Sequence, residues 1–124
     1  MKKFTLILFS FALFANTLTA TAQEEVPKEL LLSTLNSVAH LKLENEQVTA
    51  IIDYNKGFVD EVYEILDNEK EDKYKKKSMK LLGEKRENDL REIIGKSKTN
   101  KYLKLMEDEM KPLHKKEPLL KQLL

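Results

Sequence analysis

One stretch of regularly spaced side chains constrains the fold of this chain more than any other feature. Between positions 48 and 65 the spacing alternates between three and four residues, which places these side chains on one face of an α-helix. This apolar seam consists of Val48, Ile51, Asn55, Phe58, Val62 and Ile65. Heptad spacing sustained in this way predicts a long helix over residues 45–66, about 33 Å in length, that packs against other helices.

Asn55 is the one polar member of the apolar seam. In coiled coils, a buried asparagine at such a position fixes the register of the helices and lowers their stability. We therefore expect Asn55 to lie inside a helix–helix interface. By the same comparison, the substitution Asn55→Leu should raise stability while it loosens the register or the oligomeric state.

The rest of the chain beyond residue 22 also favours helix. The 124 residues include only three glycines and three prolines, and Glu, Lys and Leu dominate. A first helix is predicted over residues 27–40 and a second long helix over residues 73–94, with Gly95 as its C-cap. Arg86 interrupts the weaker apolar stripe of that second helix. Ser97 is predicted to cap a last helix, and Pro112 to stop it.

These elements predict an all-α fold, a long antiparallel helical hairpin with shorter flanking helices. The chain contains no cysteine, so a small core cannot be reinforced by disulfides, and we expect a homodimer. The charge distribution favours the same conclusion. Residues 23–72 hold 13 acidic and 4 basic side chains, whereas residues 73–124 hold 8 acidic and 16 basic ones. The two halves are expected to face each other, within one chain or between copies; two solvated surfaces of different sign are the alternative.

The first 22 residues have the pattern of a secretory signal peptide. Lys2 and Lys3 precede an apolar run (FTLILFSFALF), and Ala20 and Ala22 form the small-x-small site that signal peptidase recognises. The run is about 11 residues long, too short for a membrane-spanning helix of roughly 20. We expect cleavage before Gln23 and an exported protein, periplasmic or secreted; an uncleaved N-terminal anchor is the alternative. The predicted organisation is a signal peptide (1–22), a single helical domain (23–112) and a basic, leucine-containing tail (113–124).

No pattern of catalytic or metal-binding residues is recognisable. The sequence has no nucleophile beside a base and no glycine-rich phosphate loop, so we expect no enzymatic activity and no cofactor. His40 and His114 each lack a second ligand at helical spacing, and we expect no metal site. A basic surface is formed by Lys73, Lys76, Lys77 and Lys80. Because the protein is expected to be exported, nucleic acid is not an expected partner. One interpretation is that this surface contacts acidic proteins, unfolded proteins or anionic lipid. The alternative is that it is a solvated face without a partner.

A short motif at residues 41–47 (LKLENEQ) marks the start of the long helix. Glu44 is placed as the N-cap and Gln47 as its capping-box partner. Leu41, Leu43 and Gln47 make this stretch resemble the Spy/CpxP-type family of small periplasmic helical proteins, in which a Leu-x-Leu-Thr-x-x-Gln motif opens a long helix; Glu44 stands where the family has threonine. The resemblance implies a curved helical dimer that shields unfolded proteins without ATP, or an envelope-stress accessory protein.

The function expected from these features is that of an exported, non-enzymatic, chaperone-like protein whose partners are unfolded or envelope proteins. A structural or regulatory interaction protein of the envelope is the alternative. A metal-resistance sensor, as found among some relatives of that family, is a third possible function. The ligand residues of such sensors have no counterpart in this chain.

Overall fold

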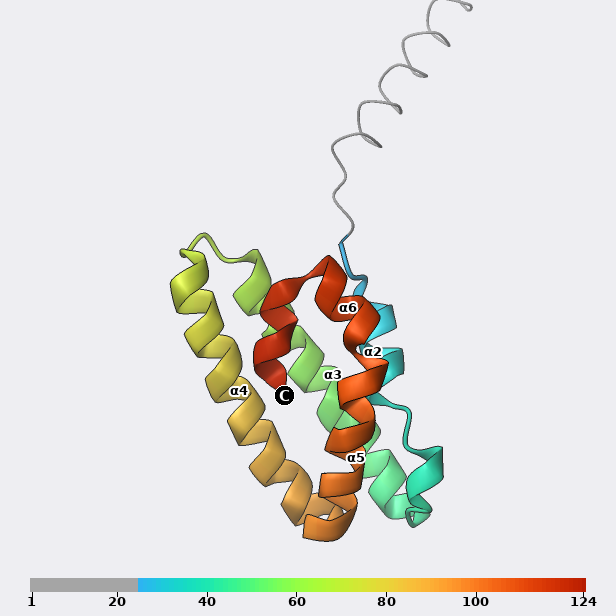
Figure 1. Ribbon diagram of the computed structural model, residues 1–124. Coiled ribbons are helices and arrows are strands. Elements are labelled where there is room, and N and C mark those ends of the chain that lie inside the picture. The colour runs from blue at the N-terminus through green and yellow to red at the C-terminus, as the bar shows by residue number, and fades with distance from the viewer. Residues whose placement is uncertain (1–24) are drawn as a thin grey trace, which may run out of the picture.

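The computed structural model describes residues 25–124, which form helices and no strand (Figure 1). The two long helices are α3 (Asn45–Asp67) and α4 (Asp72–Ile94), each of 23 residues. A short connector joins them, and they pack against each other as an antiparallel hairpin (Figure 1). The expected all-α class, with two long helices and shorter flanking ones, is confirmed. The predicted signal peptide and its cleavage site before Gln23 lie outside the described residues.

The shorter elements surround this hairpin. They are α2 (Lys28–Leu35), η1 (Ala39–Leu41), α5 (Lys96–Glu109), α6 (Lys111–Lys116) and η2 (Pro118–Leu123). α2 packs on α3, and α5 packs on α4. Gly95 alone separates α4 from α5. Its φ of +86° is readily adopted only by glycine, and its N–H donates to the Arg91 carbonyl at 2.9 Å, so it ends α4 as predicted. Within residues 25–124, no helix has the length and hydropathy needed to cross a bilayer.

Two predicted helix boundaries are wrong. The first helix ends at Leu35 rather than near His40, since Asn36 and Ser37 are weak helix formers and the Leu35 carbonyl bonds to side chains of other helices instead. The helix after Gly95 begins directly at residue 96, so Ser97 is not its cap. The last predicted helix, α5, does end just before Pro112, and Pro112 lies in the first turn of α6, where its missing N–H needs no partner.

The last twelve residues, which the sequence separates as a basic tail, belong to the packed core, and their final element η2 packs against α4. Leu119, Leu120 and Leu123 of η2 are buried. Figure 1 shows this C-terminal segment, in red, beside α4. Gly83 of α4 makes the close approach possible, because a Cβ atom at this position would lie 2.6 Å from the carbonyl oxygen of Leu123. The core therefore extends through residue 123, across the predicted domain boundary at residue 112.

Candidate functional site

A cluster of buried polar side chains lies where α2, α3, α4 and α5 meet. Asn55 and Tyr102 are fully buried, and Arg86 is 2% exposed. Nη2 of Arg86 donates hydrogen bonds to Oδ1 of Asn55 and to the hydroxyl of Tyr102, both at 2.8 Å. The Tyr102 hydroxyl donates to the Leu35 carbonyl at 2.5 Å, and Nδ2 of Asn55 donates to the same oxygen at 3.2 Å. The cluster therefore links residues of four helices, from Leu35 of α2 to Tyr102 of α5.

Arg86 carries a buried charge without a carboxylate partner. No ion pair within residues 25–124 includes it. Its guanidinium carbon lies 4.7 Å from the ring centroid of Phe58 and 5.3 Å from that of Tyr102, so two aromatic faces replace part of its lost hydration. Nε of Arg86 is buried without a hydrogen-bond partner. Because neighbouring side chains cover the guanidinium, this cluster is a structural link and offers no contact to a ligand in solution.

The apolar seam of α3 surrounds this cluster. Its central members are buried: Ile51, Asn55, Phe58 and Val62. Val48 and Ile65, at the two ends, are partly exposed. The elements that pack on α3 are α2 and α4 of the same chain. The central part of the seam is thus covered without a second copy.

The helix-start motif also joins elements rather than forming a site. Oε1 of Gln47 accepts a hydrogen bond from the Glu44 N–H at 3.0 Å, as a capping-box partner does. Nε2 of Gln47 donates to the Ile93 carbonyl at 3.3 Å. That carbonyl lies in the last turn of α4, where no intrahelical partner exists. Leu41 is buried and Leu43 is partly buried. Gln47 therefore connects the start of α3 to the end of α4.

The predicted basic surface lies on the first half of α4. Its four lysines, Lys73, Lys76, Lys77 and Lys80, are all exposed. The two oppositely charged halves of the chain do not pair directly: every ion pair among residues 25–124 joins side chains of the same half. Lys80 does face acidic side chains, because it lines a small hollow together with Glu84, Glu87 and Glu107.

A groove between α3 and α4 combines apolar and charged side chains. It has a volume of about 450 Å³ and is lined by Glu61, Glu64 and Ile65 of α3 and by Ser78, Leu81, Leu82 and Lys85 of α4. We call it the α3–α4 groove. Leu81 is 58% exposed, the most of any large apolar residue in the described range. None of the four lysines of the basic surface lines this groove. The sequence places Leu81 at the edge of the α4 stripe, and only the packing of α4 shows which side it faces.

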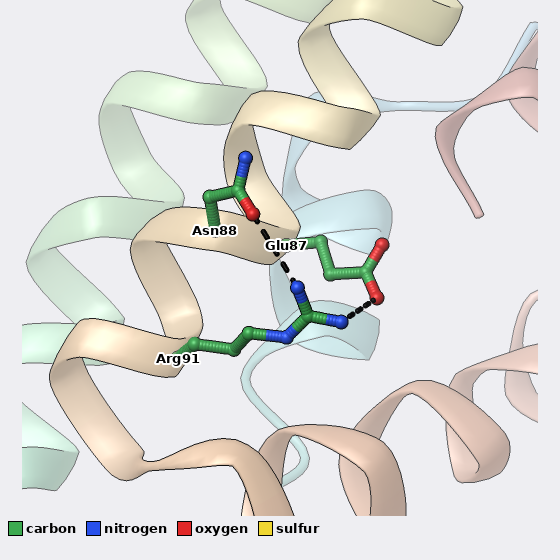
Figure 2. A network of polar contacts seen from close by, with 3 residues as sticks. All are labelled: Glu87, Asn88 and Arg91. Atoms are coloured by element: carbon green, nitrogen blue, oxygen red, sulfur yellow. Dashed lines mark hydrogen bonds and ion pairs between the residues drawn. The ribbon is translucent and has the colours of Figure 1, made fainter.

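Three further hydrogen bonds involve side chains of α4. Arg91 donates to Oε1 of Glu87 at 2.8 Å and to Oδ1 of Asn88 at 3.4 Å, as Figure 2 shows. All three residues lie on one helix near solvent, so these contacts contribute a few tenths of a kcal/mol to helix stability. Tyr54 of α3 donates to Oδ2 of Asp89 at 2.5 Å. Burial, followed by this hydrogen bond, raises the pKa of Tyr54 well above its ordinary value.

The histidines do not form a metal site with their neighbours. His40 is exposed in η1, and His114 lies on α6. Residues 25–124 contain no group of three or more His, Asp or Glu side chains arranged to hold a metal ion.

Comparisons with protein-family models, curated proteins and solved structures find no match to this chain.

Proposed function

We propose that this protein binds segments of other polypeptides in the α3–α4 groove, as an exported, chaperone-like protein that performs no catalysis. The observation that carries the proposal is the exposed side chain of Leu81 between walls of opposite charge. Glu61 and Glu64 supply acidic groups on α3, and Lys85 supplies a basic group on α4. The groove can accommodate an apolar side chain of a client whose neighbouring residues are acidic or basic. Many unrelated client sequences meet this condition.

A second exposed apolar side chain lies on α4 two turns before Leu81. Tyr74 precedes Leu81 by seven residues, which places both on the same face of the helix, and it is 55% exposed. Apolar side chains at this spacing fit one face of an amphipathic segment of a client. Burial of the exposed part of Leu81 would contribute roughly 1 kcal/mol, so the proposed binding is weak and reversible.

Two sequence features support the same proposal. The signal peptide predicted before Gln23 would send the protein to a compartment where unfolded polypeptides are handled without ATP. The motif that ends at Gln47 resembles the helix start of periplasmic chaperone-like proteins, and here it holds the two ends of the α3–α4 hairpin together.

A test of this proposal follows the light scattering of reduced α-lactalbumin as it aggregates, with and without the purified protein. Two leucine variants form a matched pair, because Leu81 and Leu30 are both exposed but only Leu81 lines the groove. The wild type and Leu30→Ser are expected to suppress scattering equally. Leu81→Ser should need several-fold more protein for the same effect, since a loss of about 1 kcal/mol is roughly fivefold in affinity.

Equal suppression by Leu81→Ser and the wild type would place the client on another surface. Failure of the wild type itself to suppress scattering would refute the chaperone-like activity. That outcome would favour a dedicated interaction partner, as expected for a structural or regulatory envelope protein.

A further inference from the structure

The last two helical elements form a second hollow, with a volume of about 590 Å³. It is lined by Lys111, Pro112, His114, Lys115, Lys116 and Lys121. All of these residues belong to α6 except Lys121, which belongs to η2. The turn between the two elements brings their lysines together, and we call this feature the basic hollow. It has no acidic residue in its lining.

Most of the positive charge in the basic hollow is uncompensated. Lys111 pairs with Oδ1 of Asp108 at 3.0 Å, with both side chains largely exposed. No ion pair within residues 25–124 includes Lys115, Lys116 or Lys121. Like charges held around one concave surface repel one another, and they create a positive potential that attracts anions.

His114 supplies a second, independent observation in the same place. Burial lowers the pKa of this imidazole, and the positive charge of Lys121 lowers it further. Nε2 of His114 is buried and has no hydrogen-bond partner. Lys111, Lys115 and Lys116 of its own helix line the same hollow as His114. Burial and the positive charge of Lys121 both disfavour the protonated ring, and an anion in the basic hollow would offset the second of these effects.

We propose that the basic hollow binds a phosphate-bearing anion. Lysine ammonium groups act as point charges and are common phosphate ligands. A phosphate group carries close to two negative charges at neutral pH, and so matches several lysines better than a single carboxylate does. The volume falls in the ordinary range of small-molecule sites, about 300–1,000 Å³. The hollow has room for a ligand larger than inorganic phosphate: a diphosphate, a soluble phosphomonoester or the phosphomonoester headgroup of phosphatidic acid.

The test compares two double variants that remove the same charge. Lys115→Ala/Lys121→Ala alters the basic hollow, whereas Lys76→Ala/Lys77→Ala removes two exposed lysines of α4 that do not line it. Binding of pyrophosphate is measured by titration calorimetry at low ionic strength. Loss of two charge-assisted contacts should weaken binding roughly 10-fold or more in the first variant. The second variant should bind like the wild type.

Two additional measurements identify the ligand source and its location. Vesicles of phosphatidic acid, compared with vesicles of phosphatidylcholine, test a membrane headgroup. The pKa of His114, followed by NMR, should rise when the ligand binds and should not rise in Lys115→Ala/Lys121→Ala. Binding of pyrophosphate alone indicates a soluble ligand, and binding of phosphatidic acid vesicles through the same lysines indicates a lipid. Equal weakening in both double variants, or binding of neither probe, would overturn the proposal.

Discussion

Replacement of Asn55 by leucine tests the buried polar cluster most directly. The coiled-coil comparison predicts that Asn55→Leu is stabilising, whereas the structure predicts the opposite. Asn55 accepts a hydrogen bond from Arg86 at 2.8 Å and donates to Oδ1 of Asn36 at 2.8 Å and to the Leu35 carbonyl at 3.2 Å. A leucine at this position can make none of these bonds, and it leaves the buried guanidinium with fewer partners.

The magnitude follows from these three contacts. A hydrogen bond to a charged group contributes about 1.5–3 kcal/mol, and each neutral one about 0.5–1.5 kcal/mol. The three bonds of Asn55 together therefore contribute roughly 2.5–6 kcal/mol. Burial of a leucine side chain returns about 2 kcal/mol. The net expectation for Asn55→Leu is a loss of about 0.5–4 kcal/mol in the free energy of unfolding, or roughly 10 °C in melting temperature for a domain of this size.

Urea unfolding followed by circular dichroism measures this loss. Asn88→Leu is the matched control, because Asn88 is an exposed asparagine within a helix and should change stability by less than about 0.5 kcal/mol. The double variant Asn55→Leu/Arg86→Met removes the buried charge together with its partner. It should be more stable than the sum of the single variants predicts, by about 1–3 kcal/mol, because the unpaired charge is then absent.

Two results would refute this reasoning. If Asn55→Leu were as stable as the wild type or more so, Asn55 would act as a coiled-coil asparagine does and not as a partner of Arg86. If the effects of Asn55→Leu and Arg86→Met were simply additive, the hydrogen bond between these side chains would contribute nothing measurable to the fold.

Two other predictions concern a pair of helical glycines and a partly buried tyrosine. Gly83→Ala should destabilise the protein by about 1–3 kcal/mol, because the new methyl group collides with the backbone of η2. Gly57→Ala, also within a long helix but with no atom near the added Cβ, should stabilise it by about 0.5–1 kcal/mol in the same urea assay. Tyr63 donates a hydrogen bond to the Val26 carbonyl, and burial raises its pKa to about 12. The contribution of this hydrogen bond to stability is therefore complete below pH ~10, the ordinary tyrosine pKa. It is lost as the pH rises towards the pKa of Tyr63 in the folded protein. Tyrosinate absorbance should show a late-titrating group that Tyr63→Phe removes, and an unchanged titration in that variant would contradict the assignment.

The sequence was sufficient for the hairpin because its signals are local. The residues predicted for the two long helices, 45–66 and 73–94, match Asn45–Asp67 and Asp72–Ile94 to within one residue at each end. Apolar spacing defines the buried face of a helix, and capping residues such as Gln47 and Gly95 act within one turn of its ends. These effects depend on neighbours a few positions away, and so they can be predicted without knowledge of the fold.

The surface sites could be predicted only in part. The lysines of the basic hollow are visible as a basic segment, yet nothing in the sequence shows that α6 and η2 turn so that Lys121 joins the lysines of α6. Leu81 looks like an edge position of a helical stripe, and its exposure depends on how α4 is rotated against α3. Both sites depend on the relative placement of elements, which spacing alone does not determine.

The sequence by itself thus determined an all-α hairpin, the buried face of α3 and the turn at Gly95. The tertiary structure decided that Arg86, which interrupts the apolar stripe of α4, lies inside the core. It also decided that the C-terminal leucines cover Gly83. In both cases the contacting residues come from parts of the chain that are not neighbours in sequence, so no local pattern links them. A buried charge requires hydrogen-bonding and aromatic partners, and these come from Asn55 and Tyr102, which lie 31 and 16 residues from Arg86 along the chain.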